Sequence, residues 1–517
     1  SIPKDITELY PLARMMKRHF ILHIGPTNSG KTHNALKALK NANSGVYLAP
    51  LRLMAYETYE TMNENGILCS MLTGEEKISV QEAKIVSMTI ELLNLDKQFN
   101  VAVIDEAQML SDTRRGGAWT NAILGLAAKE IHICMAPEAE KLTCTLIEMC
   151  ANDTYEIHHY KRKTPLVCDE EIFHFPESVR KNDALIVFSK AKVIACAAEL
   201  QKKGIKCSVI YGSLPYETRH NEVKKFVNGE TDIVVSTDAI GMGMNIPVER
   251  IVFLENNKYD GVVRRPLFPA EVKQIAGRAG RFGRYEKGYY NAEFGSFRVR
   301  EKMEREVLAL KQASIDFPTR LLSVKGRLTE IINEWKNIKL SEIFWKQNLN
   351  TMWSLAKYCE NFTDDKKLVY RLATTPVDDK NDNLISLFQC MARDILTGKK
   401  LQLSKYVEHG KWLYVDEDSE IDILEYNYKI YDLLYNIFRK FSDGKELSEI
   451  TKRKKDISAE ISKILATQAL NPKKCKYCGR ELKWNYPYSM CQKCHDSRYR
   501  PCLYESFYGD FEDEYWN

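Results

Sequence analysis

Three short segments carry residue types that can together bind and hydrolyse a nucleoside triphosphate. They are Gly25-Pro26-Thr27-Asn28-Ser29-Gly30-Lys31-Thr32, then Asp105-Glu106, then a segment that contains Gln274, Arg278 and Arg281. The first can wrap phosphates, the second can hold Mg²⁺ and orient a water, and the third can bring guanidinium groups to a phosphate. The second and third lie about 170 residues apart. The sequence therefore predicts two domains that close over one nucleotide.

The first segment matches the Gly-x4-Gly-Lys-Ser/Thr pattern of a phosphate-binding loop. An apolar strand is predicted before it, at 21–24, and a helix after it, at 31–39. Glycines let the backbone follow phosphate oxygens, and the N–H groups at the start of the helix point at them. We expect Lys31 to reach the β- and γ-phosphates and Thr32 to bind Mg²⁺. The structural alternative is a glycine turn with an incidental lysine.

The other two segments complete the expected nucleotide site. An apolar strand at 101–104 would deliver Asp105 to the Mg²⁺ and Glu106 to the attacking water. Arg278 and Arg281 are three residues apart, so a helix would place both on one face. Arginine suits bidentate phosphate contacts, and Gln274, one turn earlier, can sense the nucleotide or the water. A basic surface helix is the structural alternative for this segment.

Apolar runs alternate with helix-like segments through the first 300 residues, which predicts an α/β fold with parallel sheets. The predicted strands are 21–24, 46–50, 84–87, 101–104 and 131–135, and then, after the pattern restarts, 184–188, 207–211, 232–236 and 250–254. The later part lacks such runs and predicts amphipathic helices at 301–312, 318–335, 340–360, 383–396 and 422–441. The charge run Lys452–Lys455 is interpreted as a solvated helix face.

A cysteine pattern near the end of the chain predicts a metal site. Cys475-x2-Cys478 is followed, after twelve residues, by Cys491-x2-Cys494. Four thiolates with this spacing form a closed tetrahedral zinc site, which is structural rather than catalytic. An iron–sulfur cluster is the main alternative and disulfides are a weaker one. His495 and Cys502 are interpreted as bystanders.

Aromatic and basic residues are interleaved within and around this cysteine pattern. The aromatic residues are Trp484, Tyr486 and Tyr488, and the basic ones include Lys473, Lys474, Lys476, Arg480, Lys483 and Lys493. The aromatic rings can stack on bases and the basic side chains can bind phosphates. Alternatively, the aromatic residues pack within a small module. Both interpretations are open at this point.

Bulk properties are compatible with these interpretations. The chain has 517 residues, a net charge of +5, 44% hydrophobic and 28% charged residues. No run of about 18 apolar residues predicts a membrane span, and residues 1–20 show neither a signal-peptide pattern nor, because of Asp5 and Glu8, a transit-peptide pattern. We expect no membrane partner. The expected location is the cytoplasm of a bacterium, with the mitochondrial matrix as the alternative.

These motifs together resemble those of superfamily-two DExH nucleic-acid helicases, and more narrowly the Suv-three family, the RNA helicases of the mitochondrial degradosome and their bacterial relatives. The resemblance covers roughly residues 20–335. It is carried by the phosphate loop and by the segments Ala49-Pro50-Leu51-Arg52, Asp105-Glu106-Ala107-Gln108, Arg115–Thr120, Ser236–Asn245 and Gln274–Arg281.

The resemblance implies two tandem RecA-like domains, a helical region and, beside these, the small zinc-ribbon-like module. The expected domains are 1–19 (extension), 20–162 and 163–297 (RecA-like), 298–470 (helical), 471–502 (zinc-binding) and 503–517 (acidic aromatic tail).

The resemblance also implies roles for individual residues. Pro50, Arg52, Thr89 and Thr237 lie in segments that contact the phosphates of a nucleic-acid strand. Asp238, Gly241 and Gly243 would link nucleotide and strand, and Arg281 would be the arginine finger with Arg278 beside it.

The implied activity is that of an ATP-dependent RNA helicase, with ATP, Mg²⁺ and Zn²⁺ as cofactors, 3′-to-5′ movement, and single-stranded or partly duplex RNA as substrate. An exoribonuclease is the partner implied by the family. A DNA helicase or translocase with the same motor is the alternative, and a non-catalytic nucleotide fold is a third interpretation.

Overall fold

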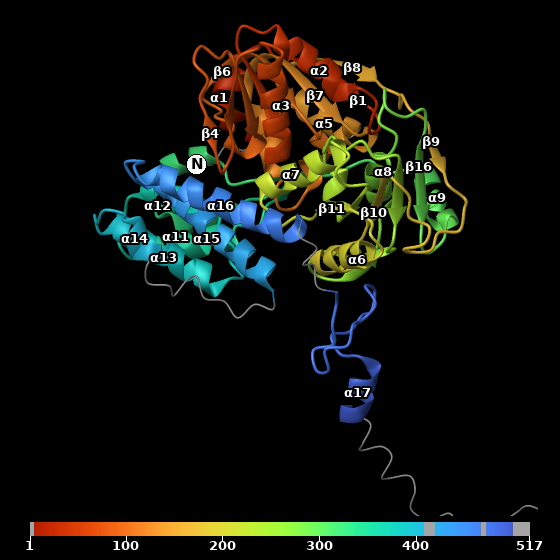
Figure 1. Ribbon diagram of the computed structural model, residues 1–517. Coiled ribbons are helices and arrows are strands. Elements are labelled where there is room, and N and C mark those ends of the chain that lie inside the picture. Colours follow the sequence, from red (N-terminus) through yellow and green to blue (C-terminus); the bar gives the residue numbers. More distant parts are fainter. Residues whose placement is uncertain (1–4, 408–418, 467–471, 500–517) are drawn as a thin grey trace, which may run out of the picture.

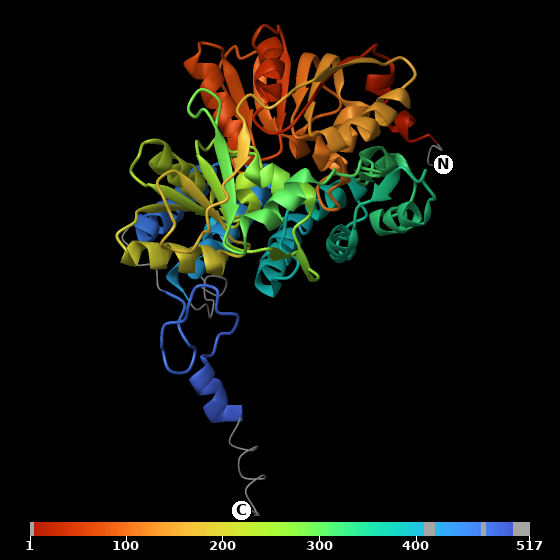
Figure 2. The ribbon, with the colours of Figure 1, turned by 90° about the vertical axis from the view of Figure 1, so that its right-hand side faces the viewer.

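The computed structural model describes residues 5–407, 419–466 and 472–499, and the acidic tail and Cys502 lie outside these residues. Two parallel sheets form two layered domains, and a helical region packs against both (Figure 1). In Figure 2 the first domain lies above the second, and the cysteine-rich module projects from the second. The predicted α/β class with a helical region is thus confirmed.

The first sheet has eight strands in the order β4-β3-β5-β2-β6-β7-β1-β8, all parallel except for the antiparallel pair β3–β4. Central strands such as β2 are buried along their whole length, which is why they read as unbroken apolar runs. The strands are β1 (His19–Ile24), β2 (Gly45–Ala49), β3 (Cys69–Leu72), β4 (Lys77–Ile78), β5 (Ile85–Thr89), β6 (Gln98–Ile104), β7 (Ala127–Met135) and β8 (Thr154–His159).

Helices and short 3-10 turns cover this sheet. They are η1 (Ile6–Leu9), α1 (Pro11–Arg14), α2 (Lys31–Lys40), α3 (Arg52–Glu64), η2 (Ile90–Leu92), η3 (Ala107–Ser111), α4 (Gly117–Gly125), η4 (Pro137–Ala139) and α5 (Glu140–Glu148). The segment predicted as an N-terminal extension is packed here: the buried Tyr10 donates to Asn121 Oδ1 at 2.6 Å and lies against Gly125.

The second sheet has six parallel strands in the order β11-β12-β10-β13-β16-β9. Its strands are β9 (Leu166–Cys168), β10 (Asp183–Ile186), β11 (Cys207–Ile210), β12 (Ile233–Ser236), β13 (Arg250–Phe253) and β16 (Gly288–Ala292), and a hairpin is formed by β14 (Asn257–Tyr259) and β15 (Arg264–Pro266). The helical elements are α6 (Lys190–Lys202), α7 (Tyr216–Val227), η5 (Asp238–Gly241), α8 (Pro269–Ala276) and α9 (Ser296–Glu304).

The region after α9 is mostly helical, as predicted, but several boundaries differ. Its elements are β17 (Ala313–Ile315), η6 (Thr319–Ser323), α10 (Leu328–Asn337), β18 (Phe344–Lys346), α11 (Asn350–Cys359), α12 (Lys366–Ala373), α13 (Asp382–Leu396), α14 (Leu403–Val407), α15 (Glu420–Phe441) and α16 (Leu447–Ala466).

Three predicted helices are wrong in part, two for a tertiary reason and one for a local backbone reason. The helix predicted at 301–312 ends at Glu304, after which Leu310 N–H bonds to the Glu138 carbonyl of the first domain at 2.9 Å. The one predicted at 318–335 is interrupted at Gly326, whose φ of 115° is incompatible with a helix. The first part of the one predicted at 340–360 is instead the strand β18, which pairs with β17.

The core of the helical region is continuous with that of the first domain. Buried side chains of α10 to α15, such as Trp335 and Phe388, belong to one cluster with Trp119 and Leu124 of the first domain. Helix α16 lies along α7 of the second domain (Figure 1). Helices α15 and α16 therefore bridge the two sheet domains.

A buried polar cluster, which we name the Glu75 junction, lies where these three parts meet. Glu75 of the first domain pairs with Arg52, accepts a hydrogen bond from Tyr428 of α15 at 2.6 Å and lies 3.7 Å from Lys454 of α16. Lys454 also pairs with Asp432 of α15 at 2.9 Å. From the second domain, Glu217 accepts a hydrogen bond from Tyr428 at 3.2 Å.

The junction corrects the interpretation of the charge run Lys452–Lys455. Lys452, Arg453 and Lys455 are exposed, as expected for a solvated face, but the Lys454 side chain is only 3% exposed. A buried ammonium is tolerated when carboxylates pair with it, and Glu75 and Asp432 do so.

The cysteine-rich module is attached to the second domain. It contains α17 (Gln492–Tyr499) and a single antiparallel bridge between Lys474 and Glu481. Trp484 is buried in the core cluster of the second domain, with its ring 5.5 Å from that of Phe175. In the part of the chain that the structure covers, no helix is long and apolar enough to cross a membrane.

We predict that Lys454→Met destabilises the protein by about 3 kcal/mol, because it leaves Glu75 buried without one of its cations. Thermal denaturation should show a lower Tm than for the wild type. The matched control is Lys452→Met, an exposed lysine on the same helix. Equal Tm values for the two variants would contradict a structural role of the junction.

Candidate active site between the two sheet domains

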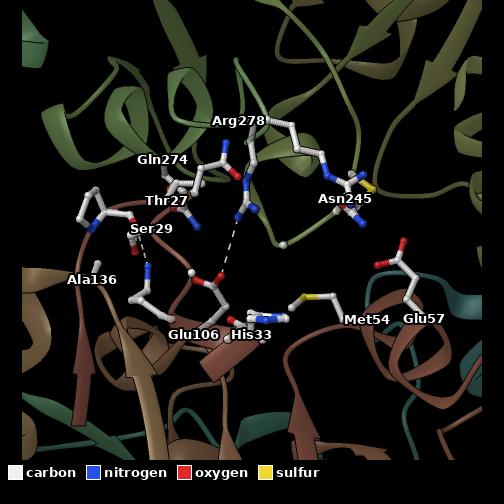
Figure 3. A pocket seen from close by; sticks show the side chains of 18 of the residues that line it. Thr27, Ser29, His33, Met54, Glu57, Glu106, Ala136, Asn245, Gln274 and Arg278 are labelled. Carbon is white, nitrogen blue, oxygen red and sulfur yellow. Dashed lines mark hydrogen bonds and ion pairs between the residues drawn. The ribbon is translucent and has the colours of Figure 1, made fainter. Parts of the chain in front are cut away.

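A cleft with a volume of about 1150 Å³ lies between the two domains. The first domain lines it with the phosphate loop, Glu106 and Ala136, and the second with Gln274, Arg278 and Arg281 (Figure 3). The three segments predicted to act on one nucleotide therefore meet in one cavity, although about 170 residues separate the second from the third.

The phosphate loop has the local geometry that its sequence predicts. Gly30 has a φ of 87°, which is left-handed and favours glycine, and α2 begins at the next residue. Lys31 Nζ donates to the Pro26 carbonyl at 2.7 Å, as does Ser29 Oγ. Burial lowers the pKa of Lys31, while Glu106 and Asp105 favour its charged form.

Asp105 is buried and lies behind Thr32, which lines the cleft. The Thr32 hydroxyl donates to both Asp105 oxygens at 3.3 Å, and Tyr47 donates to Asp105 Oδ2 at 2.8 Å. Burial, with the neighbouring Glu106, raises the pKa of Asp105 to about 6. A hydroxyl and a carboxylate at this distance are hard oxygen donors of the kind that Mg²⁺ prefers, so this pair fits the predicted metal.

Glu106 projects into the cleft from a left-handed backbone, with a φ of 53°. Such strain in a residue other than glycine costs energy and is concentrated at active sites. The side chain of Gln108 donates to Glu106 and accepts from Ala136 N–H at 3.1 Å. Gln108 therefore connects Glu106 to the segment Met135-Ala136-Pro137, a connection that spacing alone did not reveal.

The second domain reaches the same point through the turn after α8. Arg278 Nη2 lies 3.7 Å from Glu106 Oε1 and donates to the Gly241 carbonyl at 2.6 Å. Asn28 Nδ2 of the phosphate loop donates to the Gly277 carbonyl across the interface at 2.9 Å. Arg281 and Gln274 also line the cleft.

Sequence reasoning missed Arg162, which lies in the linker between the domains. Its guanidinium donates to the Gly277 carbonyl at 2.6 Å, to the Thr27 carbonyl at 3.3 Å and to the Ala279 carbonyl. It thus joins the phosphate loop to the arginine-bearing turn. A single arginine in a linker carries no pattern, so no sequence signal distinguished it.

The predicted linking residues Asp238, Gly241 and Gly243 take three different positions. Gly243 lines the cleft, and a Cβ there would clash with Met54 Sδ of the first domain. Gly241 lies behind Arg278 and accepts its hydrogen bonds. The Asp238 side chain does not line the cleft and pairs with Lys258 at 2.8 Å.

The four predicted strand-contact residues lie outside the cleft. Pro50 and Thr89 are near neighbours, because Ala49 of β2 pairs with Thr89 of β5. Thr237 follows β12 and caps η5. Arg52 starts α3 and is part of the Glu75 junction, where Asp432 of α15 lies 3.9 Å away. No contact between Arg52 and the other three is seen among the described residues.

The four predicted metal ligands converge in the module. The thiol sulfurs of Cys475, Cys478, Cys491 and Cys494 all lie within 4.8 Å of one another, and Cys478 Sγ is 3.7 Å from Cys491 Sγ. Tetrahedral zinc with Zn–S bonds of about 2.3 Å requires sulfurs about 3.8 Å apart. The donor set and spacing therefore fit zinc.

Comparison with known protein families gives two matches, one over the first sheet domain and one over most of the second. Residues 6–160 match the DEXQ-box helicase domain of Suv3, and residues 163–283 match the helicase conserved C-terminal domain. The chain is also 32% identical to the mitochondrial DExH-box ATP-dependent RNA helicase DExH16 of Arabidopsis thaliana, over 90% of this chain and 85% of that protein. The chain belongs to the Suv3-type ATP-dependent RNA helicases. The predicted family is confirmed.

Other Suv3-type relatives are longer. The mitochondrial SUV3 helicase of Saccharomyces cerevisiae is 43% identical over 54% of this chain and 39% of its own length. The SUV3 homologue of Caenorhabditis elegans is 33% identical over 84% of this chain and 62% of its own length. The expectation of a bacterial cytoplasmic protein is wrong, because these relatives are mitochondrial proteins and point to the mitochondrion instead.

We predict that Lys31→Ala and Glu106→Gln each lower the ATPase rate by at least about 100-fold, the scale expected when one group that stabilises the transition state is removed. Steady-state ATP hydrolysis by the purified variants checks this. Lys37→Ala is the control, because Lys37 is exposed on the same helix as Lys31. A near-normal rate in either cleft variant would refute this assignment of the site.

Proposed function

We propose that this Suv3-type helicase moves 3′ to 5′ along single-stranded RNA, unwinds partly duplex RNA, and serves RNA turnover with an exoribonuclease partner. The observation that carries the proposal is the meeting of two domains at one cleft, where Glu106 lies 3.7 Å from Arg278. The direction of movement, the role in turnover and the nuclease rest on the family resemblance.

The proposed chemistry assigns a role to each group in the cleft. Gly25 to Thr32 hold the phosphates, and Thr32 and Asp105 hold Mg²⁺, which neutralises phosphate charge when bound. Glu106 orients the attacking water and takes its proton. Arg278 and Arg281 stabilise the negative charge that develops on the transferred phosphate. Gln274 contacts the nucleotide or the attacking water.

Movement then follows from the position of these groups on two bodies. When both domains contact the same γ-phosphate, its presence favours the closed arrangement and its loss favours opening. Pro50, Arg52 and Thr89 belong to one domain and Thr237 to the other, so opening changes their spacing along a strand. A grip that differs between the two states produces directional steps.

The expected substrate response is an ATPase that single-stranded RNA stimulates more strongly than DNA of equal sequence. Stimulation should fall as salt rises, because binding to strand phosphates releases counterions. Rates are measured without nucleic acid, with RNA and with DNA at two salt concentrations, and Glu106→Gln controls for contaminating ATPases. Equal stimulation by DNA would contradict the RNA preference, and unwinding of 5′-overhang duplexes alone would contradict the direction.

We also propose that the cysteine module binds one structural zinc ion. The purified chain should contain one zinc per molecule by elemental analysis, and Cys491→Ser should lose most of it because only three thiolates remain. Cys390→Ser is the control, since Cys390 is partly exposed and lies outside the cluster. Iron in place of zinc, or a full zinc content in Cys491→Ser, would contradict the assignment.

A further inference from the structure

The cysteine module carries a positive surface that neither its metal site nor its attachment uses. Residues 472–499 contain seven Lys and Arg residues but only two carboxylates. One of these carboxylates, Glu481, already pairs with Lys202 of α6. Six cationic side chains are exposed among those that the structure places with side chains: Lys474, Lys476, Arg480, Lys483, Lys493 and Arg498.

The aromatic side chains of the module divide into two sets. Trp484 is 7% exposed and packs on the second domain. Tyr477 and Tyr488 are 46% and 66% exposed. Trp484 explains how the module is held on the second domain. The exposed rings of Tyr477 and Tyr488 contribute little to any core and can contact a ligand.

The fold of the module brings the two exposed tyrosines onto neighbouring segments. Lys476 N–H bonds to the Ser489 carbonyl at 2.8 Å, so the residues that flank this bond, Tyr477 and Tyr488, are held close to each other. The Arg498 guanidinium lies 3.8 Å from the centre of the Tyr477 ring. Tyr486 adds a third ring, 6.0 Å from that of Tyr488. The module therefore presents rings and cations on neighbouring segments.

We propose that this surface, formed by Tyr477, Tyr488 and the surrounding lysines, is a second binding site for single-stranded RNA. Aromatic rings stack on bases of any sequence, and lysines meet the phosphates between them. An acidic protein segment without aromatic residues would use the cations but leave the exposed rings unused, whereas every nucleotide offers both a phosphate and a base to stack. The inference deepens the proposed function and rests on it.

The position of the module indicates how a second RNA site would assist the motor. The module is attached to the second domain beside α6, on the side away from the first domain (Figure 1). A strand held there is tethered to the motor outside the cleft. Tethering raises the effective concentration of RNA at the main path and slows its loss, which benefits a motor that takes many steps on one strand.

The test measures RNA affinity of the full chain by fluorescence anisotropy with a short labelled oligouridine. Tyr477→Ser combined with Tyr488→Ser should raise Kd about tenfold or more, because each lost ring removes a stacked base. Zinc content and the RNA-free ATPase rate should stay unchanged. Trp345→Ser is the matched control, since Trp345 is 49% exposed but lies on β18 of the helical region.

A second measurement locates the contact directly. Oligouridine that carries 4-thiouridine should crosslink to peptides from 472–499. A Kd within about twofold of wild type in the zinc-loaded double variant, or crosslinks confined to the sheet domains, would overturn the inference. A wild-type chain that neither binds RNA nor responds to it would instead overturn the proposed function.

Discussion

The approach of the phosphate loop to the turn after α8 is the contact on which the active site depends. Asn28 donates to the Gly277 carbonyl at 2.9 Å, and a Cβ on Gly277 would lie 2.8 Å from Thr27 Cβ, so the two backbones meet only because residue 277 has no side chain. This approach also holds Arg278 near Glu106. Coulomb attraction falls with distance and with the entry of water. Separation of the domains would therefore weaken the attraction between Arg278 and Glu106 and leave the site incomplete.

The Glu75 junction extends this dependence to the helical region. Glu75, Lys454 and Glu217 come from three different parts of the chain. Glu75 and Lys454 are buried together with Tyr428, and the partly buried Glu217 accepts a hydrogen bond from Tyr428. Buried charges that lose a partner are costly, so any opening of the cleft that moves the second domain must rearrange these contacts or carry α15 and α16 with it. Arg52, which the family resemblance places near the strand, lies in this junction. Under the proposed function, the junction would connect the nucleotide state to the grip on the strand.

The cysteine module depends on a different constraint. A segment of about 28 residues is too short to bury a core of its own, so docking and, under the proposed function, a metal would hold it in order. Four converging thiols offer the ligands for such a metal, and the insertion of Trp484 beside Phe175 is the docking contact. Because the docking surface belongs to the second domain, the proposed opening of the cleft would carry the module and its exposed rings with that domain.

The amino-acid sequence by itself determined the features that depend on neighbouring residues. The phosphate loop, the Asp105-Glu106 pair after a buried strand, the paired cysteines and the apolar strands could be predicted, because each needs only its own spacing and burial pattern. Only the tertiary structure decided the roles of Arg162 and Lys454, the strand β18 in place of a helix, and the placement of Arg52 in a buried junction. These depend on partners more than 30 residues away along the chain. A sequence records spacing along the chain, whereas the free energy of a buried charge or of a strand end depends on what the rest of the fold brings to it.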